Sequence, residues 1–138
     1  MTKSNLASKK SAKSLARKIL IIEDDVSLIK ALILALQKAG FETKDALTAE
    51  DGLLKAVKEK PDLILLDIRL PKMDGLTMLR KLREDPWGKE VPVVLLTNMN
   101  SPEHVAKATE YRAFDYLVKS DWKLEDVVNK IKQKLRME

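Results

Sequence analysis

The sequence predicts an α/β fold with a parallel sheet, because strand and helix signals alternate from residue 18 to the end of the chain. Four short apolar runs lack the polar alternation of half-exposed strands, which is typical of strands buried on both faces. Five successive strand–helix units favour right-handed crossovers and helices on both faces of the sheet. At 138 residues, the chain has room for one such domain.

The first half of the chain contains two strand–helix units with recognisable ends. Gly40 follows the first helical pattern as a left-handed terminating residue. Thr48 caps the second helix. The second strand is polar, so we place it at an edge of the sheet. The expected elements are strands at 18–22 and 42–47 and helices at 26–39 and 49–59.

Turn and cap residues delimit the three units of the second half. Asp74 and Gly75 form a turn before one helix, and Ser101 followed by Pro102 is typical of the start of the next. Trp87, in the loop between these helices, is expected to pack against the bottom of the domain. The expected elements are strands at 62–67, 91–96 and 114–118 and helices at 76–84, 102–111 and 121–135.

The net charge of +5 comes from the N-terminal tail. Residues 1–18 hold six of the 26 basic residues and no acid, which leaves 20 basic residues against 21 acids in residues 19–138. We therefore divide the chain into a basic, flexible tail at 1–17 and a nearly neutral domain at 18–138. The tail is a solvated leader, a segment that contacts nucleic acid or anionic membrane, or an organelle transit peptide.

Composition excludes several classes of site. Without cysteine, the chain has no disulfide, thiolate metal site or thiol nucleophile, which fits a reducing compartment. The longest apolar stretch, residues 31–36, is far shorter than the roughly 18 residues of a membrane span. The N-terminus also lacks the apolar segment of a signal peptide. We therefore predict a cytoplasmic protein with no membrane partner.

Polar residues stand where the apolar runs end. Glu23 and Asp24 follow the first run, Asp67 ends the third strand, Thr97 follows the fourth and Lys119 follows the fifth. Because the carboxyl ends of parallel strands meet at one edge of a sheet, we expect these side chains to lie close together. The simpler alternatives are acids that stabilise a helix dipole, a threonine that caps a strand end and a solvated surface lysine.

Five motifs cover most of the chain: ILIIEDD at 19–25, PDLILLD at 61–67, LPKMDG at 70–75, LLT at 95–97 and DYLVK at 115–119. In this order, they resemble the response-regulator receiver domain of two-component phosphorelays, over roughly residues 18–137. The resemblance implies a single flavodoxin-like domain with strand order 2-1-3-4-5 and an active site at the switch between strands 1 and 3. It also implies a phosphoacceptor that catalyses its own phosphorylation and is not a turnover enzyme.

The acids at the predicted site call for a cation, because Glu23 and Asp24 add negative charge beside Asp67. Oxygen ligands of this kind suit Mg²⁺, with Mn²⁺ as a substitute. By resemblance, Asp24, Asp67 and the backbone carbonyl of Arg69 bind the metal directly, and Glu23 acts through water. Asp67 would be the nucleophile that forms an acyl phosphate.

The resemblance assigns Lys119 and Thr97 to the phosphoryl oxygens, Lys119 as a charge partner and Thr97 as a hydroxyl donor. Movement of Thr97 toward the phosphoryl group would leave space into which Tyr116 turns. Arg69 and Met99, two residues beyond the acceptor and the threonine, tune the lifetime of the acyl phosphate. Neither has a carboxylate or amide that orients water, so we expect a long-lived phosphoryl group.

The resemblance places the output surface on the fourth helix, fifth strand and fifth helix. A histidine kinase or phosphotransfer protein would supply the phosphoryl group, and the output surface would then bind a partner or form a homodimer. Trp122 is either an anchor for that partner or a packing residue, and His104 is interpreted as a surface residue. The predicted output residues are His104, Lys107, Tyr111, Trp122, Lys123 and Asp126.

Three positions depart from the family pattern. Ser120 follows Lys119 where the family has a proline after a cis bond. We expect a trans bond here, because a non-proline cis bond costs roughly 3 kcal/mol. Arg112 stands where glycine is usual, and Asn98 replaces a small residue and could crowd the path of the Tyr116 ring.

Two other functions fit parts of the sequence. A nucleic-acid-binding regulator could use the basic tail for affinity and the domain as a scaffold. A metal-dependent phosphohydrolase could use the same acids. Neither alternative accounts for the series Thr97, Tyr116 and Lys119.

Overall fold

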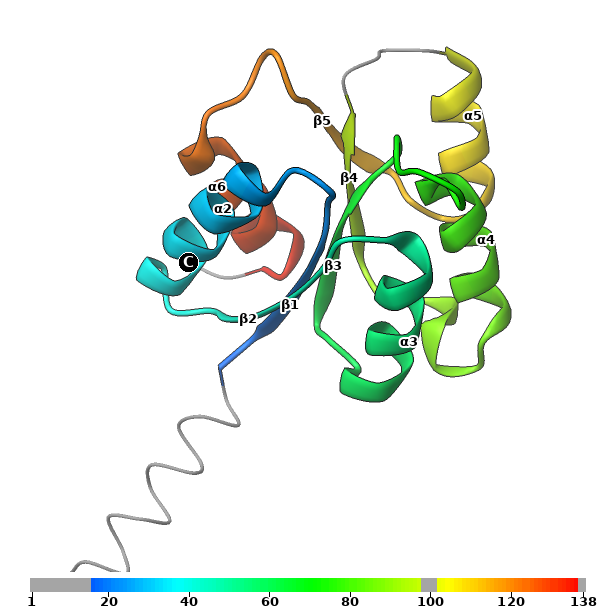
Figure 1. Ribbon diagram of the computed structural model, residues 1–138, viewed down its shortest axis with the longest axis horizontal. Coiled ribbons are helices and arrows are strands. Elements are labelled where there is room, and N and C mark those ends of the chain that lie inside the picture. Colours follow the sequence, from blue (N-terminus) through cyan, green and yellow to red (C-terminus); the bar gives the residue numbers. More distant parts are fainter. Residues whose placement is uncertain (1–15, 98–101, 137–138) are drawn as a thin grey trace, which may run out of the picture.

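The computed structural model describes residues 16–97 and 102–136. Its centre is a five-stranded parallel sheet in the order β2-β1-β3-β4-β5 (Figure 1), which confirms the predicted architecture. The strands are β1 (Lys18–Ile22), β2 (Glu42–Ala46), β3 (Leu63–Asp67), β4 (Val93–Thr97) and β5 (Asp115–Val118). The helices are α2 (Val26–Lys38), α3 (Ala49–Glu59), α4 (Gly75–Glu84), α5 (Pro102–Glu110) and α6 (Leu124–Lys134), with a 3₁₀ turn η1 (Trp87–Lys89).

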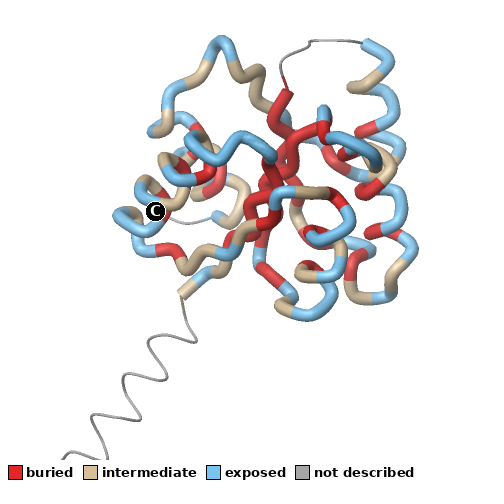
Figure 2. Tube along the Cα trace, viewed as in Figure 1, coloured by how far each residue is buried: buried red, intermediate tan, exposed pale blue. Residues whose placement is uncertain are grey.

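Different helices cover the two faces of the sheet, α2 and α6 on one face and α3, α4 and α5 on the other (Figure 1). The central strands are apolar throughout, so their alternating side chains fill two separate cores. In β1, Ile19 and Ile21 join the core beneath α2 and α6, whereas Leu20 and Ile22 join the other core. Figure 2 shows the buried residues following the central strands.

The predicted signals at helix ends and at the sheet edge are confirmed. Gly40 follows α2 with a left-handed φ of 96°. The Thr48 hydroxyl accepts from the Asp51 backbone N–H at 3.1 Å and so caps α3. The polar strand β2 lies at an edge of the sheet. Trp87 packs against the core beneath α3, α4 and α5, as predicted.

Several boundaries differ from the prediction. Helix α6 begins at Leu124 rather than at 121, because residues 119–123 form a turn in which Lys123 is extended (φ −107°, ψ 166°). Strand β4 begins two residues later than expected, after Pro92, which has no N–H to donate to a neighbouring strand. The strand also ends one residue later than predicted, so Thr97 is its last residue and not the first residue after it. Residues 87–89, predicted as loop, form the 3₁₀ turn.

The predictions for Asn98, Met99, Ser101 and residues 1–15 fall on parts of the chain outside the described residues. Within the described part, no helix is both long enough and apolar enough to cross a membrane.

Arg83 is a buried cation on α4 for which the sequence pattern contains no signal. Its guanidinium donates hydrogen bonds of 2.8–3.0 Å to the backbone carbonyls of Gly88, Val91, Tyr111 and Arg112. Burial and the nearby charge of Arg112 lower the pKa of Arg83 to about 10, so the group remains charged at neutral pH. Arg83 thus ties the end of α4 to the end of α5 and to the segment before β4.

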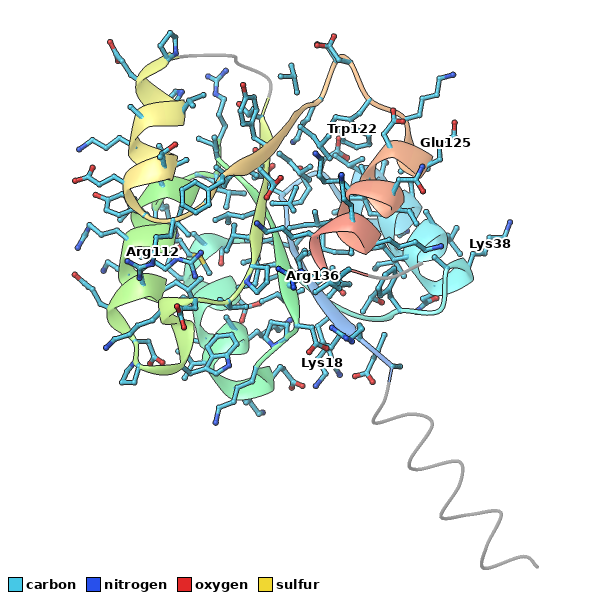
Figure 3. All side chains as sticks on the ribbon, turned by 180° about the vertical axis from the view of Figure 1, so that it is seen from behind. Lys18, Lys38, Arg112, Trp122, Glu125 and Arg136 are labelled. Carbon is cyan, nitrogen blue, oxygen red and sulfur yellow. The ribbon has the colours of Figure 1, made fainter. Side chains whose placement is uncertain are left out.

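Arg112 has a left-handed backbone (φ 59°), the conformation that glycine adopts without strain. Its side chain lies on the α4 and α5 side of the sheet (Figure 3). There it donates from Nε and a terminal nitrogen to the Lys89 carbonyl, at 3.1 and 2.8 Å. These two bonds offset part of the strain of a non-glycine residue in this conformation.

Candidate functional site

Strand register brings the four polar strand-end residues to one edge of the sheet. Ile22, the last residue of β1, pairs with Leu66, the residue before Asp67. Asp67 pairs with Leu96, and Thr97 pairs with Val118 one step further along. Glu23 directly follows β1, Asp67 ends β3, Thr97 ends β4 and Lys119 directly follows β5. The structure therefore gathers these residues at the carboxyl edge, as the sequence predicts.

Three carboxylates converge at this edge. One oxygen from each of Glu23, Asp24 and Asp67 lies within 4.8 Å of the other two. The Glu23 and Asp67 side chains are only 1% and 4% exposed, whereas Asp24 lies at the surface. The charge of Asp67 disfavours the ionised form of Glu23, and burial removes the water that would screen the two groups. One cation could contact all three acids.

Lys119 places a positive charge between the two buried acids. Its Nζ lies 2.5 Å from Glu23 Oε1 and 3.1 Å from Asp67 Oδ2. Burial acts to lower the pKa of Lys119, but the hydrogen bond to Glu23 and the charge of Asp67 outweigh it, so the pKa is raised. Lys119 is therefore an ammonium at neutral pH. The peptide bond from Lys119 to Ser120 is trans, as predicted.

The burial of the Glu23 carboxylate is only partly compensated by its hydrogen bonds. Burial raises the pKa of Glu23 above its ordinary value, although hydrogen bonds from Lys119 and from the Asp25 backbone N–H oppose that shift. The Asp25 N–H donates to Glu23 Oε2 at 3.1 Å. Lys119 therefore compensates only part of the cost of burying the Glu23 carboxylate.

The backbone around Asp67 holds its carboxylate in place. The Arg69 N–H donates to Asp67 Oδ1 at 3.1 Å, and the Gly75 N–H donates to the Ile68 carbonyl at 2.9 Å. The start of α4 approaches the end of β3 so closely that a Cβ at position 75 would collide with the Asp67 carbonyl. The motif residue Gly75 is thus required by the close approach of two backbone segments.

Thr97 lies beside a small cavity between β4, β5 and α5. The Thr97 residue is 3% exposed, whereas Tyr116, which lines the same cavity from β5, is 39% exposed. The cavity volume is about 20 Å³, space for about one water molecule. Thr97 and Tyr116 therefore share a cavity that is smaller than a tyrosine ring.

His104 has a different environment from the predicted surface position. It is half-buried, and it lines both the Thr97 cavity and an open groove beside the acids. Asp24, Arg69 and Asp74 line the same groove. His104 therefore lies between the acidic cluster and the cavity, a position that residue spacing on α5 alone does not reveal.

The other predicted output residues divide into exposed and packed side chains. Lys107, Lys123 and Asp126 are exposed. Tyr111 and Trp122 are partly buried against the two cores, and Figure 3 shows Trp122 near the start of α6. Asp126 Oδ2 accepts from the Lys123 N–H at 2.7 Å, so these two residues also stabilise the first turn of α6.

Comparison with known proteins matches residues 19–132 to the family model described as response regulator receiver domain. A curated relative, the DNA-binding dual master transcriptional regulator RpaA of Synechocystis sp., is 34% identical over 119 residues, 86% of this chain and 49% of that protein. Among solved structures, the chemotaxis protein CheY4 of Vibrio cholerae has a TM-score of 0.80 at 28% identity, with 86% of this chain and 98% of CheY4 covered.

A response regulator receiver domain protein (CheY-like) from Methanospirillum hungatei has a TM-score of 0.82 at 30% identity, with 88% of this chain and 94% of that chain covered. The chain spans about half the length, or less, of the first curated relatives that it matches. The family model and the full-length structural matches agree on one assignment. The chain belongs to the response-regulator receiver domain family of two-component signal transduction.

Proposed function

We propose that this receiver accepts a phosphoryl group on Asp67 from a histidine kinase or phosphotransfer protein. The observation that carries the proposal is the Lys119 ammonium between the buried carboxylates of Asp67 and Glu23, with Asp24 beside them. An acid that must carry a dianionic phosphoryl group needs permanent positive charge within reach.

Magnesium fits the donor set, with Mn²⁺ as a substitute. The donors are all oxygen atoms, one carboxylate is exposed to solvent, and burial leaves Glu23 incompletely compensated. Asp24, Asp67 and the backbone carbonyl of Arg69 would hold the cation directly, and Glu23 through water. When bound, Mg²⁺ neutralises the acids and so lets an anionic phosphodonor approach.

Different residues of the site then have different roles in phosphoryl transfer. An Asp67 oxygen attacks phosphorus and forms a new oxygen–phosphorus bond, while the bond from phosphorus to the donor's leaving atom breaks. The Arg69 N–H at Asp67 Oδ1 holds the carboxylate in orientation. Lys119 pairs with one phosphoryl oxygen, and the Thr97 hydroxyl donates a hydrogen bond to another.

The proposed switch connects this chemistry to the output surface on α5, β5 and α6. Movement of Thr97 toward the phosphoryl group enlarges the cavity that it shares with Tyr116, and the tyrosine ring turns inward. Lys107, Lys123 and Asp126 keep exposed side chains for a partner or a second copy of the chain. Tyr111, Trp122 and His104 contribute their partly exposed edges.

The proposal includes a single phosphorylation per chain, without turnover, and a phosphoryl group that persists because exposed Arg69 does not orient water. Met99, the second lifetime-tuning residue of the proposal, lies outside the described residues. We assign the receiver to residues 18–138 and a basic tail to 1–17, in a cytoplasmic protein. Contact with nucleic acid is proposed only through the tail.

The proposal is tested by locating the modified residue. The full chain is incubated with Mg²⁺ and acetyl phosphate, reduced with borohydride, digested and analysed by mass spectrometry. The expected result is reduction of Asp67 alone, with no more than one phosphate consumed per chain before slow hydrolysis. Reduction at another acid contradicts the proposal, and many phosphates released per chain without labelling would support the phosphohydrolase instead. Salt-dependent DNA binding that deletion of residues 1–17 abolishes would support the nucleic-acid-binding regulator.

A further inference from the structure

His104 has an unsatisfied polar atom at the wall of the Thr97 cavity. Its Nδ1 is buried and has no hydrogen-bond partner in the part of the chain that the structure describes. A buried nitrogen without a partner costs free energy, so such an atom is normally paired in at least one functional state. The cavity that His104 lines is otherwise mostly apolar, with Leu95, Val105 and Ala108 among its walls.

Tyr116 lines the same cavity from another element of the fold. His104 is on α5, whereas Tyr116 is on the edge strand β5, where it pairs in register with Leu95 of β4. Tyr116 is 39% exposed, so much of the residue contacts water in this state. A tyrosine that turns into an apolar cavity loses that water and needs an acceptor for its O–H.

Few acceptors are present in the cavity. The polar side chains that line it, apart from Tyr116, are Thr97, His104 and Thr109. The Thr109 hydroxyl already donates to the Val105 carbonyl at 2.9 Å within α5. Thr97 is the residue that the proposed switch draws toward the phosphoryl group. Among the described side chains that line the cavity, His104 Nδ1 is the acceptor that remains.

We infer that His104 Nδ1 accepts a hydrogen bond from the Tyr116 hydroxyl once the ring has turned into the cavity. The inference rests on the proposed function, since it specifies how the switched state is held. It makes His104 a positioning residue, with a neutral imidazole that carries its proton on Nε2 and receives the tyrosine proton at Nδ1. The bond would satisfy two polar atoms at once and favour the inward ring.

The fold allows the cavity to widen at the end where His104 lies. The cavity has space for about one water molecule, so in this inference α5 shifts to admit the tyrosine ring. Arg83 holds the C-terminal end of α5 through the Tyr111 and Arg112 carbonyls, at 2.8 and 3.0 Å. His104 is in the first turn, at the other end of the helix. A small outward pivot therefore opens the cavity beside His104.

The test uses the fact that the chain has one histidine and two tyrosines. The full chain is labelled with ¹⁵N-histidine, and the ring nitrogens are observed by NMR before and after addition of Mg²⁺ and beryllofluoride, a phosphoryl mimic. The expected result is an unprotonated Nδ1 that moves upfield on activation, as a nitrogen does when it accepts a hydrogen bond. The change should disappear in Tyr116→Phe and persist in the matched variant Tyr111→Phe.

Binding of beryllofluoride is followed in the same samples by ¹⁹F NMR, which separates the two claims. If the fluoride does not bind, the proposed function fails. If it binds and Nδ1 does not move, or moves equally in Tyr116→Phe, the inference is wrong.

Beryllofluoride titration of further variants provides a thermodynamic test. His104→Phe keeps a ring without an acceptor and should weaken beryllofluoride affinity about fivefold, as should Tyr116→Phe. The double variant should lose little more than either single variant. Additive losses would show that the two residues act independently and overturn the inference.

Discussion

The Lys119 ammonium lies 3.1 Å from Asp67 Oδ2, although the two residues are 52 positions apart along the chain. The same ammonium lies 2.5 Å from Glu23. The lysine therefore compensates the carboxylates that, in our proposal, also hold Mg²⁺ and receive the phosphoryl group. Lys119 and a metal ion are competitors for the same negative charge as well as cooperating groups in phosphoryl transfer.

Replacement of Lys119 by methionine should separate these two roles. The buried acids lose their positive partner, so we expect a lower free energy of unfolding without metal, by about 3 kcal/mol. Apparent Mg²⁺ affinity should rise about tenfold, whereas the rate of phosphorylation by acetyl phosphate should fall at least tenfold. Urea unfolding, calorimetric Mg²⁺ titration and the time course of labelling by acetyl phosphate measure the three effects. Lys123→Met, on the exposed turn before α6, is the control and should change none of them. Unchanged Mg²⁺ affinity in the Lys119 variant would contradict the competition.

Replacement of Glu23 by glutamine should change how stability depends on pH in metal-free buffer. The pKa of Glu23 is raised in the folded state, mainly by burial, so folded protein binds this proton more tightly than the unfolded chain. Wild-type stability therefore falls as pH rises from about 4.5 through the folded-state pKa, and glutamine removes that loss.

The advantage of Glu23→Gln over wild type should accordingly grow through this window and then level off. Urea unfolding at a series of pH values measures it, with exposed Glu125→Gln as the control. A wild type that gains stability relative to Glu23→Gln as pH rises would mean that the pair with Lys119 outweighs burial.

Two arginines one turn apart on α4 should differ strongly in their contribution to stability. Arg83→Met leaves four backbone carbonyls without their donor, so we expect a loss of about 3–5 kcal/mol in the free energy of unfolding. Arg80→Met removes only an exposed pair with Glu84 and should change stability by less than about 0.5 kcal/mol. Equal effects in urea unfolding would show that the buried hydrogen bonds of Arg83 contribute nothing beyond a surface pair.

The free-energy cost of the left-handed backbone at Arg112 can be measured by comparing the stability of two truncated variants. Arg112→Ala and Arg112→Gly both lose the bonds to the Lys89 carbonyl, but only alanine keeps a Cβ at φ 59°. The glycine variant should therefore be more stable than the alanine variant by about 1 kcal/mol. Thermal unfolding of both variants checks this, and an alanine variant as stable as the glycine variant would rule out backbone strain at this position.

The fold could be predicted from local patterns, because each buried strand has its own apolar run and most helices have their own cap. The polar composition of β2 likewise predicts its position at an edge of the sheet. The start of α6 was predicted three residues early, since the extended backbone at Lys123 depends on the turn after Lys119. Arg83 was not identified, because backbone carbonyls are its partners and they leave no trace in side-chain spacing.

Only some of the residues at the site could be predicted from the sequence. Glu23, Asp67 and Lys119 could be placed together because parallel strands end at one edge, and the structure brings them within hydrogen-bonding distance. His104 was interpreted as a surface residue, because its burial depends on how α5 lies over β4 and β5. Side chains on a partly exposed helix acquire their environment from tertiary packing, which residue spacing does not encode.

Intact-protein mass spectrometry can show whether Asp67 accepts the phosphoryl group. Wild type and Asp67→Asn are incubated with Mg²⁺ and acetyl phosphate, and both are weighed without digestion. We expect a single gain of about 80 Da, one PO₃H group, in wild type only, and none when EDTA removes the metal. An equal gain in Asp67→Asn, or no gain in wild type with Mg²⁺ present, would contradict the proposal.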